Sequence, residues 1–144
     1  MKNITFLICG LLCSTILANA QNRNIPVDTT VVTAHTTTIN GATISYTATT
    51  GTQPVWDELG KPIATLFYTY YKKTTKENSA HRPLLISFNG GPGSASVWMH
   101  VAYTGPKVLN IDDEGYPVQP YGVHENAHSI LDVADIVYVN TVNT

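Results

Sequence analysis

Cysteine is almost missing from this sequence. Among its 144 residues only Cys9 and Cys13 are cysteines, and both lie within the first 20. That stretch has the pattern of a cleaved leader, so we expect the mature chain to hold no thiol. A disulfide framework and a cysteine-ligated metal site are thereby excluded for residues 21–144.

Charge is also scarce. Charged residues make up 12% of the sequence, and the formal net charge is −2. Chains that bind nucleic acid carry an excess of basic residues, so no nucleic-acid partner is expected. Aromatic side chains are present instead, with eight tyrosines and two tryptophans. They indicate a packed domain and argue against disorder.

The first 20 residues have the features of a secretory signal peptide. Lys2 gives a positive start, residues 4–17 are mostly apolar, and residues 18–20 (Ala-Asn-Ala) form a small-residue cleavage site. The apolar run is too short to span a membrane comfortably. We therefore expect cleavage before Gln21 and a secreted or periplasmic protein without stable membrane insertion. A lipid anchor at Cys13 is the alternative.

We treat the mature chain, residues 21–144, as one domain. The sequence of its first half predicts antiparallel strands. Residues 29–39 are rich in Thr and Val, which favour strands, and Asn40-Gly41 is a strong hairpin signal. Residues 42–50 then alternate apolar and polar side chains, as a half-buried strand does. A loop carrying Pro54 is predicted over residues 51–60, and a third, aromatic-rich strand over residues 62–73.

The second half predicts parallel strands. Residues 84–88 and 136–139 are two nearly continuous apolar runs, which are typical of parallel strands buried on both faces. Residues 97–103 predict a short helix with Trp98 and Val101 directed inward, and residues 129–135 a helical turn. The polar residues 72–82 predict a solvent loop, with a solvated basic edge formed by Lys72, Lys73 and Lys76.

A glycine-rich turn follows the apolar run at residues 84–88. It reads Asn89-Gly90-Gly91-Pro92-Gly93. Glycine lets another group approach the backbone closely, and Pro92 removes one N–H donor. Ser94 and Ser96 can cap a following helix. A strand, a rigid loop of donors and a helix start can together hold a negative charge. A tight turn without chemistry is the alternative.

This turn carries a resemblance to a known family. Asn89-Gly90-Gly91-Pro92-Gly93-Ser94 resembles the signature of the serine carboxypeptidases, which are α/β-hydrolases. The similarity extends over residues 66–144, including the aromatic run before the turn and the strand at residues 135–140. It implies an α/β fold that is the N-terminal part of an α/β-hydrolase sheet, with an antiparallel hairpin followed by the first parallel strands. It also implies a serine-type peptidase that cleaves peptide substrates at the C-terminus without a cofactor.

The resemblance also implies roles for individual residues. Gly91 corresponds to the glycine whose N–H faces the oxyanion, and Gly90 helps to shape the loop. Asn89 corresponds to a residue that helps to hold the terminal carboxylate of the substrate. The family often has a second carboxylate-binding group, a Glu, at the position of Tyr103, whose phenol can also donate a hydrogen bond. A cysteine common in the family is replaced by Ser94.

The nucleophile of the family is missing from the sequence. It sits in a Gly-x-Ser-x-Gly elbow, and no such motif occurs in these 144 residues. We therefore expect this chain to be the front part of a hydrolase, with the Ser, Asp and His of the triad beyond its last residue. By itself the chain is expected to be inactive.

Two other functions remain open at this point. The segment from His124 through Glu125 to His128 is a literal His-Glu-x-x-His, which on a helix would offer two zinc ligands and a base. Nearby prolines and the lack of a third ligand favour a chance match, so no metal is expected. A non-catalytic β-rich binding domain is the second alternative. The isolated His35, His81 and His100 are interpreted as surface or structural residues.

Overall fold

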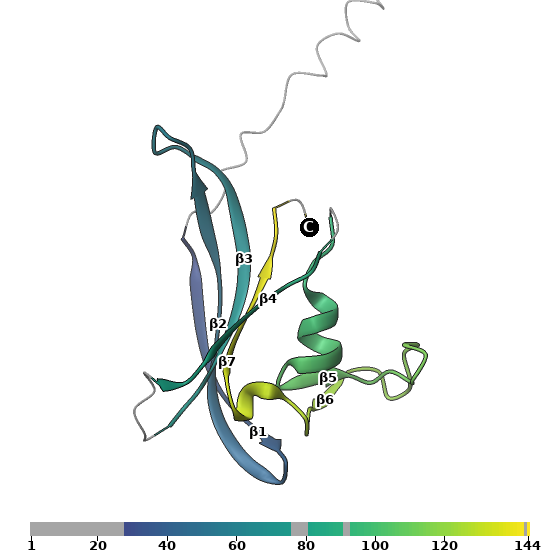
Figure 1. The fold of residues 1–144 in the computed structure, drawn as a ribbon. Coiled ribbons are helices and arrows are strands. Elements are labelled where there is room, and N and C mark those ends of the chain that lie inside the picture. The colour runs from purple at the N-terminus through teal and green to yellow at the C-terminus, as the bar shows by residue number, and fades with distance from the viewer. Residues whose placement is uncertain (1–27, 76–80, 91–92, 143) are drawn as a thin grey trace, which may run out of the picture.

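The computed structural model of the chain describes residues 28–75, 81–90, 93–142 and 144. Its main feature is a five-stranded mixed sheet in the order β1-β2-β3-β7-β4 (Figure 1). Strands β4 and β7 are parallel, and the other neighbours are antiparallel. The strands are β1 Thr30–Ile39, β2 Ala42–Trp56, β3 Pro62–Lys73, β4 Leu84–Phe88, β5 Lys107–Leu109, β6 Val123–Glu125 and β7 Asp135–Asn140. The short helical elements are η2 Met99–Thr104 and η3 Ile130–Asp132.

The predicted hairpin between β1 and β2 is confirmed. Asn40 and Gly41 have φ values of 50° and 79°, and a tight hairpin turn that matches the twist of its strands requires positive φ at both positions. Ile39 pairs with Ala42 across this turn. Ile44 and Tyr46 are buried on one face of β2, as the alternating pattern predicts.

The predicted loop over residues 51–60 is wrong in its first half, because β2 continues to Trp56. Pro54 is tolerated in this strand because of its place in the sheet. Thr52 directs its N–H toward β1, donating to the Thr29 carbonyl at 2.9 Å, and Pro54 has the same orientation two residues later. The β1 ladder ends at the pair Thr30–Gly51. The missing N–H of Pro54 therefore points beyond the end of the β1 ladder, where no described strand pairs with it.

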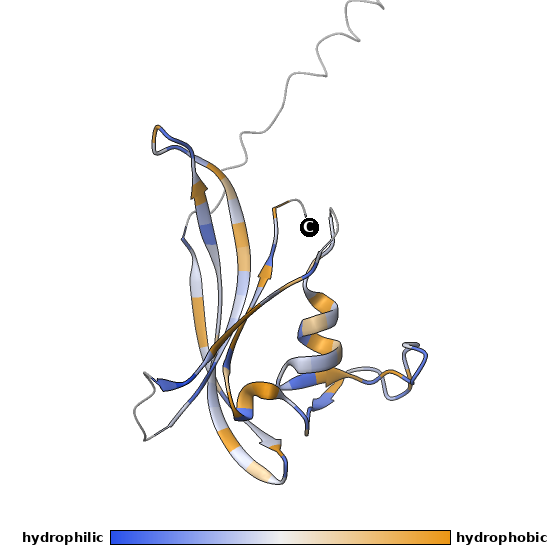
Figure 2. Ribbon diagram, in the orientation of Figure 1, coloured by the Kyte–Doolittle hydropathy of each residue, from blue (hydrophilic) through white to orange (hydrophobic). Residues whose placement is uncertain are grey.

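The two apolar runs behave differently from each other. β7 lies between β3 and β4, with Ile136 and Tyr138 buried, which agrees with a strand covered on both faces. β4 was expected to be equally buried, but this is wrong. It is the outer strand of the described sheet, and Ile86 and Phe88 are 59% and 64% exposed. Figure 2 shows β4 as an apolar strand crossing in front of the sheet.

The helix predicted after the glycine loop is present but differs in detail. Its second part, η2, is a π-helical turn in which the Gly105 N–H donates to the His100 carbonyl at 3.1 Å. The inward prediction for Trp98, which stands just before this turn, is wrong: its side chain is half exposed. Met99 packs against the core instead. None of the described helices is long and apolar enough to cross a membrane.

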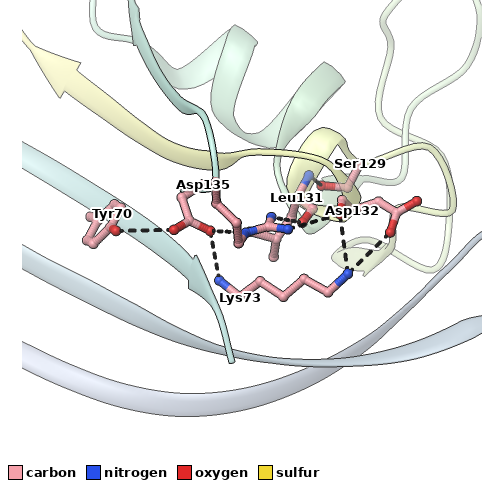
Figure 3. Close-up of polar contacts among 7 residues, drawn as sticks. Tyr70, Lys73, Ser129, Leu131, Asp132 and Asp135 are labelled. Atoms are coloured by element: carbon pink, nitrogen blue, oxygen red, sulfur yellow. Dashed lines mark hydrogen bonds and ion pairs between the residues drawn. The ribbon is translucent and has the colours of Figure 1, made fainter. Parts of the chain in front are cut away.

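An ion-pair network joins the amino ends of β4 and β7 (Figure 3). Arg82 Nε lies 3.0 Å from Asp135 Oδ1, and Arg82 also donates to the Leu131 carbonyl at 2.9 Å. Lys73 Nζ pairs with Asp132 Oδ1 at 3.4 Å. The predicted solvated loop is therefore wrong at both its ends, because Arg82 and Lys73 bind acidic residues that lie far ahead in the sequence.

Candidate functional site

The candidate site lies at the carboxyl ends of β4 and β7. The two strands are parallel, and Phe88 pairs with Val139 at the last step of their ladder. The residues that follow, Asn89 and Asn140, therefore lie at the same end of the sheet, where Asn140 still pairs with Phe67 of β3. In open α/β sheets, ligands bind in the crevice outside the carboxyl ends of the strands.

The side chain of Asn89 is held by the loop that it begins. Its Nδ2 donates to Ser94 Oγ at 2.6 Å, and its backbone N–H donates to Ser96 Oγ at 3.1 Å. The second N–H of the amide group makes no hydrogen bond with a described residue, so one donor is left for a ligand. Asn89 is half-buried, which leaves the amide accessible from outside the sheet.

The glycines of the loop are only partly described. Gly90 is exposed, and a side chain built there would meet nothing within 4 Å. The backbone next to Asn89 is therefore open to an approaching molecule. Gly91 and Pro92 lie outside the described residues, so the predicted oxyanion donor of Gly91 stays a prediction.

Ser96 was predicted as a helix cap, but its hydroxyl has another role. It donates to the Val139 carbonyl at 2.5 Å and accepts the Asn89 N–H. The Ser96 N–H donates to Asn140 Oδ1 at 2.9 Å. Sequence reasoning therefore missed Asn140 as a site residue. Its only signal was an amide side chain at the end of an apolar strand.

Tyr103 lies farther along the same helical segment. Seven residues separate it from Ser96, about 10 Å along a helix axis, and no hydrogen bond joins it to Asn89. Its side chain is 63% exposed and lines an open pocket of 440 Å³. Trp98, Ala102 and His124 also line this pocket. The structure thus places Tyr103 within the helical segment that follows the glycine loop, without a hydrogen bond to Asn89.

An aromatic cluster anchors this helical segment to the sheet. His100 Nε2 lies 2.6 Å from the Tyr71 hydroxyl, and the His100 ring stacks on Tyr138 with ring centroids 4.5 Å apart. Tyr138 bonds in turn to Thr104 Oγ1 at 2.8 Å. Burial lowers the pKa of His100 and raises that of Tyr138 to about 12, which favours the neutral form of both groups. His100 has the structural position expected from the sequence.

The His-Glu-x-x-His segment is not a helix. His124 and Glu125 end strand β6, where successive side chains point to opposite faces, and His128 lies in the following turn. Glu125 Oε2 accepts the Thr38 N–H at 3.2 Å, and hydrogen bonding with Thr38, foremost with its side chain, lowers the pKa of Glu125. In the described part of the chain, no three His, Cys, Asp or Glu side chains gather as metal ligands. The zinc-peptidase alternative therefore has no geometric support.

Comparison with known proteins gives the family. No curated protein matches the chain. The family model described as serine carboxypeptidase matches residues 56–142, a span that runs from the end of β2 through β7 and includes the whole glycine loop. Since this match covers more than half of the chain, the protein belongs to the serine carboxypeptidase family, a family of peptidases.

Proposed function

We propose that this chain supplies the oxyanion loop and the terminal-carboxylate site of a secreted or periplasmic serine carboxypeptidase. The observation that carries the proposal is the position of Asn89. It stands at the carboxyl ends of two parallel strands, with one amide N–H bound to Ser94 and the other making no hydrogen bond with a described residue. The exposed backbone of Gly90 follows it directly.

The loop has two functions in the reaction: it stabilises the oxyanion, and it binds the terminal carboxylate of the substrate. A serine hydroxyl attacks the last peptide carbonyl of the substrate, and negative charge develops on the carbonyl oxygen. The Gly91 N–H stabilises this oxyanion, because a preorganised donor costs no reorganisation during the reaction. The Asn89 amide donates to the terminal carboxylate and so selects the last residue of the peptide.

The nucleophile comes from chain outside residues 1–144, since no Gly-x-Ser-x-Gly motif occurs within them. The outer edge of β4 offers the place for that part of the hydrolase. β4 is apolar and exposed at this edge of the described sheet, and an unpaired edge accepts a further strand. A strand added there ends next to Asn89, on the same side as the glycine loop.

The pocket next to the helical segment that follows the glycine loop accommodates the terminal side chain of the substrate. Trp98 and Tyr103 supply aromatic surface, and the pocket volume is 440 Å³. Pockets of this kind combine apolar contact with polar groups that set orientation, and here Asp112, Asp113 and Glu114 add an acidic wall. The Tyr103 hydroxyl supplies one such donor at the rim, as the second carboxylate ligand that the family position implies.

The test uses the full-length protein, expressed with its leader. We expect it to release single residues from the C-terminus of peptides, and a serine-directed phosphonofluoridate to abolish this release. The same peptides with a C-terminal amide should be cleaved much more slowly. Absence of cleavage, or cleavage that resists the phosphonofluoridate, would overturn the proposal.

A further inference from the structure

The glycine loop is closed at its base by one serine. Ser96 accepts the backbone N–H of Asn89 at 3.1 Å, so the first and last residues of the segment 89–96 are held together. The segment contains three glycines, and such a chain samples many conformations when its ends are free. The contact at its base removes much of that freedom.

The same serine also joins the loop to the neighbouring strand. Its hydroxyl donates to the Val139 carbonyl at 2.5 Å, and its N–H donates to Asn140 Oδ1 at 2.9 Å. Ser96 is 1% exposed, so water does not compete for these bonds. β7 is itself paired on both sides, with β3 and β4. The loop is therefore fastened to a well-supported strand of the sheet.

We infer that Ser96 and Asn140 are positioning residues, which set the place of the oxyanion loop relative to the sheet. This inference rests on the proposed function for its effect on catalysis. Neither side chain touches the substrate. Asn140 acts through Ser96, and Ser96 acts through the backbone of Asn89 at the start of the loop. An oxyanion donor must lie within hydrogen-bond distance of one developing charge, so a shift of the loop by about 1 Å costs about 100-fold in rate.

The decisive pair of substitutions is at Asn140. Asn140→Leu has a similar shape but no acceptor for the Ser96 N–H, whereas Asn140→Asp keeps an acceptor oxygen. In the full-length enzyme we expect Asn140→Leu to lower kcat by about 100-fold with an unchanged KM, and Asn140→Asp to restore most of kcat. Equal losses in the two variants, or a normal kcat in Asn140→Leu, would overturn the inference.

The matched control is Asn110→Leu. Asn110 is a half-buried asparagine whose Nδ2 donates to the Val118 and Pro120 carbonyls at 3.1 and 3.0 Å. It thus fastens a different loop, residues 110–120, through its side-chain amide. We expect this variant to keep the kcat of the wild type.

Amide hydrogen exchange tests the same inference without activity. The Ser96 and Asn89 amides should be protected in the wild type and in Asn140→Asp. Asn140→Leu should accelerate exchange at Ser96, while the amides of β7 that pair with β3 stay protected. Ser96→Ala, which keeps the N–H bond to Asn140, should accelerate exchange at Asn89 instead. An inactive wild type would overturn the proposed function. Unchanged exchange in both variants would separately overturn the positioning role.

Discussion

The guanidinium of Arg82 and the carboxylate of Asp135 meet at 3.0 Å where β4 and β7 begin. Both side chains are largely buried, at 17% and 7% exposure. At the opposite ends of the same two strands lie Asn89 and Asn140. The amino ends of this strand pair therefore hold the sheet together, and the carboxyl ends present the candidate site.

Breaking the buried ion pair between Arg82 and Asp135 is expected to lower the stability of the protein strongly. Asp135→Ala leaves the Arg82 guanidinium without its counter-ion, and breaking a buried pair typically costs about 3–5 kcal/mol. We expect the free energy of unfolding, measured with urea, to fall by that amount. Lys107→Met is the control, because its pair with Glu125 is 41% and 47% exposed. That loss should stay within about 1 kcal/mol, and equal losses would contradict the prediction.

The buried His100 predicts a pH dependence of stability. Burial lowers its pKa in the folded state, so the unfolded state binds a proton more readily. The contribution of neutral His100 is fully present above the unfolded pKa of about 6.5. It is lost as the pH falls from there toward the lower folded pKa.

His100→Gln removes the titrating group and keeps a polar partner for the Tyr71 hydroxyl. We expect its unfolding free energy to depend less on pH than that of the wild type over this acidic range. The control is His81→Gln, since His81 is exposed. A slope that is the same in His100→Gln and the wild type would show that His100 is not responsible.

The oxyanion role of Gly91 predicts a loss of turnover. Gly91→Pro deletes the N–H donor in the complete enzyme, and loss of one such donor costs about 100- to 1,000-fold in kcat. Circular dichroism must show an intact fold, because proline also restricts the backbone. A folded variant with normal kcat would remove Gly91 from the oxyanion site.

The carboxylate role of Asn89 predicts a change in specificity. A hydrogen bond to a charged group contributes about 1.5–3 kcal/mol, so Asn89→Ala should lower kcat/KM for free-acid peptides by about 10- to 150-fold more than for the matching amides. The ratio of two substrates within one variant cancels general damage. Tyr103→Phe, measured in the same way, tests the second proposed donor. Equal losses on both substrates would leave Asn89 with a loop-shaping role only.

The exposed edge of β4 predicts self-association of residues 21–144 produced alone. β7 is paired on both sides, and β4 is the outer strand of the described sheet. Ile86→Lys puts a charge on the exposed strand, which natural edge strands use against aggregation. Light scattering should show less association than in the wild type. Leu59→Lys, at a turn residue that is 93% exposed, should change little, and a monomeric wild type would refute the prediction.

The local sequence was enough to predict several structural elements. Asn40-Gly41 requires only its own two backbone conformations to form a hairpin, and residues 62–73 were predicted with the bounds of β3. The glycine loop and the parallel pairing of β4 with β7 could also be predicted. The hairpin, β3 and the glycine loop each follow from a motif or pattern within a few neighbouring residues, and two separate apolar runs indicate the parallel pair.

Only the tertiary structure decided the features that depend on distant partners. Pro54 fits within a strand because β1 ends beside it, and Met99 rather than Trp98 packs against the core of the sheet. Arg82 finds Asp135 across 53 positions of sequence, and Ser96 finds Asn140 across 44. The order of the strands determines these contacts, because it brings the ends of β4 and β7 together. No local pattern of residues encodes which distant side chains will meet there.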